Sequence, residues 1–146
     1  MADIERRASA EWNGGLMAGS GKTSTGSGVL KDVPYSVPSR FENANGTNPE
    51  ELLAAAHASC FSMMMAKVLG DEKKTAKSIS TKANLTLGQR GGGWKIVKLH
   101  LDTEVSGDGL DDATLQKAAG IAKDQCPVSV LLKPGLEQLS MTAKLK

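Results

Sequence analysis

Residues 47–62 read TNPEELLAAAHASCFS, and this stretch predicts the helix around which the chain folds. Asn48 is a good N-cap, Pro49 suits the first helical position because no amide hydrogen is needed there, and Glu51 follows the cap by three residues, where its carboxylate can bond back. We expect the helix to run to about Leu69, because a glycine follows.

This helix is apolar nearly all round, with alanines at 54–56 and methionines at 63–65. A helix without a polar face belongs in an interior. A short chain covers such a helix most easily with a sheet wrapped around it or with a second copy of itself. Aromatic residues make up only 3% of the chain, so a monomer core would be thin and oligomerisation would help.

The rest of the chain predicts strands and two more helical segments. Before the long helix stand short extended pieces broken by glycine and proline, at residues 8–12, 22–25, 28–30 and 33–37, and then a polar loop at 38–48. After it, a period of two predicts a hairpin with strands at about 79–87 and 94–105 and a turn at 91–93. The apolar parity slips between Ile96 and Val97, which predicts a bulge.

The C-terminal part predicts a helix, a helical turn and a strand. Asp111 or Asp112 can cap a helix that ends near Gln125, and Cys126-Pro127 can begin a short helical turn that reaches about Lys133. Residues 139–145 alternate as a closing strand. We therefore predict an α+β fold, as one domain over residues 1–146.

The charges of the chain argue against some partners. It carries 18 basic and 16 acidic residues, a formal net charge of +2, with no long basic run. We therefore expect no nucleic acid partner. The first residues lack the apolar core of a signal peptide, and no later segment has about 18 uninterrupted apolar residues. We expect no membrane association and a cytoplasmic location.

The only two cysteines, Cys60 and Cys126, are placed for chemistry. In the cytosol a disulfide is more often transient and catalytic than structural, although a structural staple would suit an exported protein. Cys126 precedes a proline that can open a helix, where free amide groups favour a thiolate. Cys60 lies about three turns into its helix, where the dipole is weak, so it needs a cation from elsewhere. Arg40 is the best candidate.

Arginine suits this task because a planar guanidinium holds a thiolate and a peroxide oxygen together and stays charged when desolvated. A carboxylate from Glu50 or Glu51 could fix the guanidinium. Glu51 is better placed for capping, which leaves Glu50 freer to pair. The alternative for Arg40 is a solvated loop residue.

His57 stands three residues before Cys60 and shares its helical face, which is compatible with a Cys–His nucleophile. A buried histidine packed in an alanine-rich helix is the simpler interpretation. His57, Cys60, His100 and Cys126 could be counted as four zinc ligands. Structural zinc sites, however, have ligand pairs only a few residues apart on both sides, and these four residues do not have that spacing. We expect neither a metal nor a cofactor.

Four segments carry a resemblance to a known family: Arg40-Phe41-Glu42, GTNPEEL at 46–52, AAHASCFS at 55–62 and CPVS at 126–129. On these segments the chain resembles the osmotically inducible protein C (OsmC) family of peroxidases, over nearly its whole length. The related organic hydroperoxide resistance proteins share Gly-Thr-Asn-Pro-Glu but usually carry Cys-Pro-Tyr-Ser at the second thiol. Val128 and residues 40–42 therefore favour the OsmC branch.

The resemblance implies an intertwined homodimer in which strongly curved antiparallel sheets wrap around long central helices, with active sites at the subunit interface. It implies that Cys60 is the peroxidatic nucleophile and Cys126 the resolving thiol. Arg40 would hold the thiolate and the leaving oxygen, in its own chain or across the dimer, and Glu50 would orient Arg40.

The substrates implied are organic hydroperoxides and, more weakly, hydrogen peroxide, in defence against oxidative or osmotic stress. An external dithiol, either a lipoylated protein or a thioredoxin-type donor, would reduce the enzyme. Two other classes stay open: a non-catalytic thiol sensor and a structural domain with inert cysteines. Thiol reactivity separates these classes, because only a peroxidase turns over.

Overall fold

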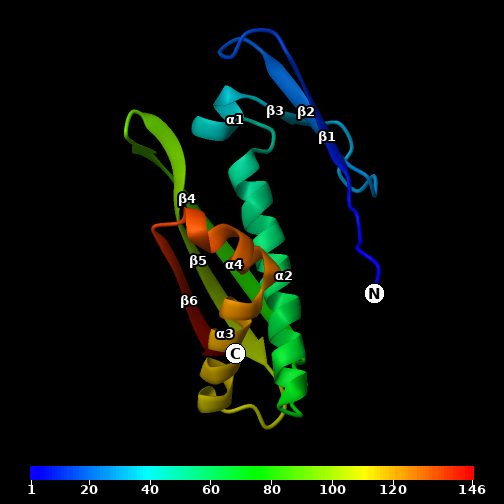
Figure 1. The fold of residues 1–146 in the computed structure, drawn as a ribbon, viewed down its shortest axis with the longest axis vertical. Helices are drawn as coiled ribbons and strands as arrows, with labels where there is room; N and C mark the ends of the chain where they lie inside the picture. The colour runs from blue at the N-terminus through cyan, green and yellow to red at the C-terminus, as the bar shows by residue number, and fades with distance from the viewer. The chain divides into compact units, whose positions relative to one another are not determined.

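The computed structural model describes residues 1–146, which form two compact units, residues 1–52 and 53–146. Figure 1 shows the order of the elements from the N-terminus to the C-terminus. The long helix α2, Pro49–Asp71, begins in the first unit and continues through the second.

The N-terminal unit contains a three-stranded antiparallel sheet in the order β1-β2-β3. Its strands are β1 (Ala8–Asn13), β2 (Ser20–Thr25) and β3 (Val33–Tyr35). Three of the four predicted extended pieces are thereby confirmed. Residues 28–30 are not a strand, because the chain turns there and Gly28 has a φ of +76°.

A short helix, α1 (Val37–Phe41), replaces the first part of the predicted loop at 38–48. Its N-cap is Ser36, whose Oγ accepts from the Ser39 N–H, while Ser39 Oγ accepts from the Ser36 N–H. The Ser39 side chain is buried and also donates to the Thr47 carbonyl at 2.8 Å. Arg40 therefore lies in the last turn of a capped helix, and not in a loop.

Helix α2 begins at Pro49 as predicted, because Asn48 Oδ1 accepts from the Glu51 N–H at 2.8 Å. The sequence predicted that the Glu51 carboxylate accepts from the backbone N–H of Asn48. In the structure it accepts from the Thr47 hydroxyl, at 2.6 Å. Gly70 does not end the helix, which continues to Asp71.

By length and composition alone, α2 could cross a membrane: it has 23 residues, and its most apolar window has a mean hydropathy of 1.5. Counting uninterrupted apolar residues did not detect this segment, because serine and histidine interrupt it. A core helix of a globular protein passes the same test. Five α2 residues are buried: His57, Phe61, Met65, Val68 and Leu69.

The C-terminal unit contains a second three-stranded sheet, in the order β4-β5-β6. The strands β4 (Ser78–Arg90) and β5 (Gly93–Ser106) form the predicted hairpin. Thr86 pairs with Lys98 and Leu87 with Ile96, so Val97 is the extra residue of a bulge at the predicted position.

The closing strand β6 (Gln138–Leu145) is parallel to β5, which corrects the prediction of purely antiparallel sheets. Between β5 and β6 the chain forms α3 (Asp112–Gln125), α4 (Pro127–Leu132) and the 3-10 turn η1 (Lys133–Gly135). A helical crossover of this length returns the chain to the end of the sheet at which β5 began, so the next strand runs parallel. The α+β class is confirmed.

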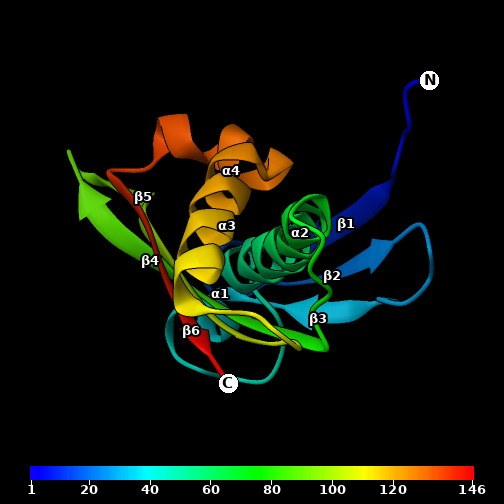
Figure 2. The ribbon, with the colours of Figure 1, turned by 90° about the horizontal axis from the view of Figure 1, so that it is seen from below.

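The core of the C-terminal unit lies between the sheet and its helices, where α2 and α3 lie side by side against one face (Figure 2). Phe61 and Met65 of α2 meet Leu115 of α3 and Leu99 and Leu101 of β5 in one cluster. Cys126 belongs to this cluster and Cys60 packs against it, so both thiols lie at the core of the unit.

Candidate active site

The first group of predicted site residues is an ion pair within the N-terminal unit. Arg40 Nε donates to both carboxylate oxygens of Glu50 at 3.1 Å, and Arg40 Nη2 donates to Oε1 at 2.5 Å. The guanidinium also lies over the Phe41 ring, 5.4 Å from its centroid. The structure thus pairs Arg40 with Glu50 and leaves Glu51 to the helix start, as the sequence indicated.

The Arg40 side chain is 38% exposed and that of Glu50 only 12% exposed. A planar guanidinium bound edge-on to one carboxylate has a fixed orientation and leaves other N–H groups available. The arrangement therefore presents an oriented cation at the start of α2.

The second group is the pair of cysteines within the C-terminal unit. Both are free thiols; Cys126 is fully buried and Cys60 partly exposed. The Cys126 side chain is close enough to Cys60 to act on the pKa of the Cys60 thiol. The two cysteines, 66 residues apart in the sequence, are therefore neighbours within the C-terminal unit.

Burial raises the pKa of the Cys60 thiol, and the neighbouring Cys126 raises it further. The backbone N–H of Val128 opposes this effect by donating a hydrogen bond to Cys60. Within the C-terminal unit the groups that shift this pKa include no cation. Because the thiolate is the nucleophile, Cys60 calls for a positive charge to become reactive.

Cys126 occupies the N-cap position of α4, as predicted, but its side chain makes no capping hydrogen bond. The sequence suggested that the free amide groups of α4 act on the Cys126 sulfur. In the structure the Cys126 side chain instead neighbours the Cys60 thiol. Val128, in the first turn of α4, donates its backbone N–H to Cys60.

Two buried residues beside the thiols are also paired. His57 Nε2 and Ser129 Oγ are 2.6 Å apart, and both side chains are fully or almost fully buried. Burial lowers the pKa of His57, so its imidazole is neutral at pH 7. His57 is therefore a buried core histidine, as expected, and the Cys–His nucleophile finds no support.

Sequence reasoning missed the roles of Val128 and Ser129. The available signal was spacing: His57 precedes Cys60 by three residues on one face of a helix, and Ser129 follows Cys126 by three residues. That spacing did not show that His57 and Ser129, which are 72 residues apart in the sequence, would contact each other.

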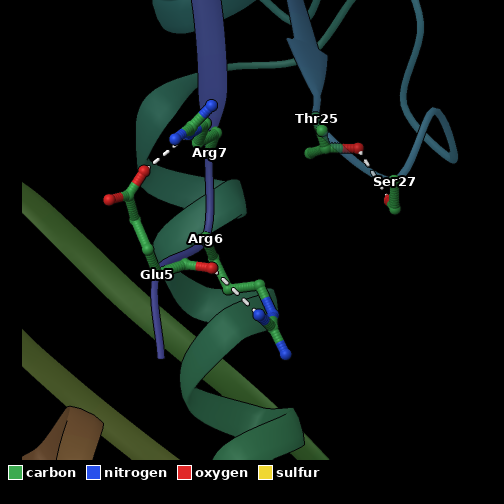
Figure 3. Close-up of a pocket in the computed structure, with 6 residues that line it drawn as sticks. Glu5, Arg6, Arg7, Thr25 and Ser27 are labelled. Atoms are coloured by element: carbon green, nitrogen blue, oxygen red, sulfur yellow. Dashed lines mark hydrogen bonds and ion pairs between the residues drawn. The ribbon is translucent and has the colours of Figure 1, made fainter. Parts of the chain in front are cut away.

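A hollow of about 650 Å³ lies in the N-terminal unit, lined by Glu5, Arg6, Arg7, Thr25, Gly26 and Ser27 (Figure 3). Arg7 pairs with the Glu5 carboxylate there, and both side chains are largely exposed. None of its lining residues belongs to the predicted site. Nowhere in residues 1–146 do three histidine, cysteine or carboxylate side chains lie together so that they could hold a metal ion.

The fold and the site define an α+β protein with a dithiol centre. A family model described as OsmC-like protein matches residues 42–137, so the chain belongs to the OsmC family, as the sequence motifs predicted. The chain is 44% identical to Peroxiredoxin OsmC of Escherichia coli over 130 residues, which is 89% of this chain and 91% of that protein.

A more distant relative agrees with this assignment, and a solved structure has a similar fold. The chain is 35% identical to an organic hydroperoxide resistance protein of Xanthomonas axonopodis over 101 residues, 67% of this chain and 69% of that protein. The fold is similar to the crystal structure of the organic hydroperoxide resistance protein OhrB of Bacillus subtilis, with a TM-score of 0.69 and 24% identity over 96% of this chain and 98% of that one. The higher identity to the OsmC relative agrees with the predicted branch.

Proposed function

We propose that this protein is a cysteine-based peroxidase that reduces organic hydroperoxides and, more weakly, hydrogen peroxide, in defence against oxidative or osmotic stress. The single observation that carries the proposal is the pair of free, neighbouring thiols, Cys60 and Cys126. The names of the relatives, peroxiredoxin and organic hydroperoxide resistance protein, support an enzyme over a sensor or a structural domain.

In the first step the Cys60 thiolate attacks the distal oxygen of the hydroperoxide. The S–O bond forms, the O–O bond breaks, and the alkoxide takes up a proton to leave as an alcohol, or as water from hydrogen peroxide. Cys60 is oxidised to a sulfenic acid. Partial exposure of Cys60 gives the peroxide access to the sulfur.

In the second step Cys126 attacks the sulfenic sulfur. The S–S bond forms, the S–O bond breaks, and the hydroxyl leaves as water with the proton of the Cys126 thiol. An external dithiol, a lipoylated protein or a thioredoxin-type donor, then reopens the disulfide by exchange. Burial of Cys126 leaves Cys60 as the sulfur that this dithiol attacks.

Arg40 is the cation that we assign to the Cys60 thiolate and to the leaving oxygen, in its own chain or across a dimer, and Glu50 is its orienting carboxylate. Two observations support these roles: the raised pKa of Cys60 calls for a cation, and the Arg40–Glu50 pair presents one in a fixed orientation. We also propose that residues 1–146 are one functional domain.

A homodimer is the assembly that we propose. One stripe of α2 is exposed and is formed by small or apolar residues at helical spacing: Ala55, Ala56, Ser59, Met63 and Ala66. Met63 is 75% exposed, and α4 adds Val130 at 58% and Leu131 at 75%. Short side chains let another helix approach closely, so a second copy of α2 fits this stripe.

We also propose a cytoplasmic location, without a membrane or nucleic acid partner.

The test is consumption of cumene hydroperoxide and hydrogen peroxide with dithiothreitol as reductant, by the wild type, Cys60→Ser and Cys126→Ser. We expect faster removal of the organic peroxide by the wild type, no turnover in Cys60→Ser, and accumulation of a trappable sulfenic acid in Cys126→Ser. Equal and negligible activity in all three proteins would overturn the proposal.

A further inference from the structure

A short helix has to be held where the resolving thiol needs it. Helix α4 has six residues, too few for a helix to be stable by itself, and its N-cap residue Cys126 makes no capping hydrogen bond. Val130 and Leu131 are exposed. The position of its first turn must therefore come from contacts made by its buried side chains.

Two contacts join this turn to α2, and they are matched in register. Cys126 meets Cys60, and three residues on, Ser129 meets His57, which stands three residues before Cys60. His57 and Cys60 are three residues apart and lie on one face of α2. Cys126 is the N-cap residue of α4 and Ser129 lies in its first turn, so the two contacts join the same two segments. Val128, between them, donates its N–H to Cys60.

The contact between His57 and Ser129 does not change during the proposed catalytic cycle. During the proposed cycle the sulfur of Cys60 becomes a sulfenic acid and then a disulfide, so its contact with Cys126 changes at each step. The hydrogen bond of 2.6 Å between His57 and Ser129 involves no reacting atom and is closed to water.

The direction of this hydrogen bond follows from the other ring nitrogen. His57 Nδ1 is buried and has no partner. If Nδ1 carried the proton, a buried N–H would stay without an acceptor, which is the more costly arrangement. We therefore assign Nε2–H as the donor and Ser129 Oγ as the acceptor.

We propose that His57 and Ser129 are positioning residues for the resolving step: their buried hydrogen bond holds the first turn of α4 on α2 and so keeps the Cys126 thiol aimed at Cys60. This inference rests on the proposed peroxidase function for its role in the cycle. The positioning itself is a property of the two thiols and can be measured without peroxide.

The first measurement is the equilibrium between the Cys60–Cys126 disulfide and glutathione, which reports how effectively Cys126 is presented to Cys60. In Ser129→Ala we expect this effective concentration to fall by about three- to tenfold, the worth of one neutral hydrogen bond. Ser78→Ala is the matched control, because it also removes one neutral serine hydrogen bond, to Ser106, at exposed positions of the same unit that belong to neither the thiol site nor the proposed dimer interface. An unchanged equilibrium in a folded Ser129→Ala protein would overturn the proposal.

Two further variants separate positioning from a general loss of structure. His57→Gln keeps an N–H donor and should restore most of the effect lost in His57→Leu, and the double variant His57→Leu/Ser129→Ala should be no worse than either single variant. Circular dichroism at pH 7.5 checks that each variant is folded. Additive losses in the double variant, or failure of glutamine to rescue, would contradict a shared hydrogen bond.

The second measurement is a single turnover with cumene hydroperoxide and no reductant. Trapping the sulfenic acid with dimedone follows the first step, and loss of free thiol follows the second. We expect Ser129→Ala to keep the first rate within about twofold and to slow disulfide formation by about three- to tenfold. With excess cumene hydroperoxide more sulfinic acid should form at Cys60, because a second hydroperoxide can then oxidise the longer-lived sulfenic acid and leave as a second alcohol. Equal slowing of both steps would overturn the inference. If the wild type forms no sulfenic acid, the proposed function fails, and the glutathione equilibrium alone decides the positioning.

Discussion

The reactivity of Cys60 is set by opposed effects at single residues. Burial and the neighbouring Cys126 raise the pKa of Cys60, and the Val128 N–H lowers it by less. A raised pKa leaves little thiolate at neutral pH, so the proposed role of Arg40 is to supply the missing charge. Lysine carries the same charge but cannot bind a carboxylate with two parallel hydrogen bonds.

Arg40→Lys should therefore reduce turnover of cumene hydroperoxide by about 100-fold, because the ammonium group loses the orientation that Glu50 imposes. Glu50→Gln should lower the rate in the same direction and by less. Glu51→Gln is the matched control, since its carboxylate bonds Thr47. Wild-type rates in Arg40→Lys, measured with dithiothreitol as reductant, would remove Arg40 from the mechanism.

His57 should make the stability of the fold depend on pH. Burial lowers its pKa below the ordinary 6.5, so the unfolded chain takes up a proton at a higher pH than the folded chain. The stabilisation is complete above about pH 6.5 and is lost as the pH falls toward the folded-state pKa, by up to about 1.4 kcal/mol per pH unit. Urea unfolding at pH 7.5 and 5.5 should show a smaller decrease in His57→Gln than in the wild type. An equal decrease in the two proteins would refute this assignment.

At the scale of elements, local signals decide where helices and turns begin. The β4–β5 hairpin turns at Gly91 and Gly92, which have φ values of +58° and +81°. No atoms lie near a side chain built at Gly91, so only its backbone conformation restricts substitution there. A β-branched residue is strained in this region, whereas asparagine tolerates it.

Gly91→Val should lower the free energy of unfolding by about 1–2 kcal/mol, and Gly91→Asn should change it by much less. Gly93→Val serves as a control at the end of the same turn, where φ is not positive and nothing lies nearby. Urea denaturation followed by circular dichroism measures all three. The prediction fails if valine and asparagine at position 91 prove equally stable.

Elements also differ in how much the sequence could predict about them. The α2 start, the hairpin and its bulge at Val97 depend on neighbours within a few residues, so the sequence pattern predicted them. For the α3 N-cap the sequence left Asp111 and Asp112 open, and the structure has Asp111. Helix α1 also has a capping box, but its third helical position holds Ser39 in place of the usual glutamate or glutamine. The sequence pattern therefore did not predict this helix.

At the scale of the whole molecule, the exposed apolar stripe of α2 is the strongest sign of a partner copy. An exposed helix with few charged residues leaves apolar surface in water, at a cost that burial against a second subunit would remove. Met63 lies in the middle of that stripe and is 75% exposed.

Met63→Glu should therefore shift the protein from dimer to monomer in sedimentation velocity, because a buried, unpaired carboxylate opposes association. Lys67→Glu is the matched control on the same helix, since Lys67 is exposed and pairs with Asp71 within its own chain. Identical sedimentation of Met63→Glu and the wild type would rule out this stripe as the dimer interface.

The sequence by itself determined helices α2, α3 and α4, the β4–β5 hairpin, the OsmC family and the two candidate cysteines, because caps, periodicity and motifs are local in the chain. Only the tertiary structure decided that β6 runs parallel to β5, that Val128 donates to Cys60 and that Ser129 bonds His57. These contacts join residues far apart in sequence, and their partners are selected by which surfaces pack together, a property that no short pattern contains.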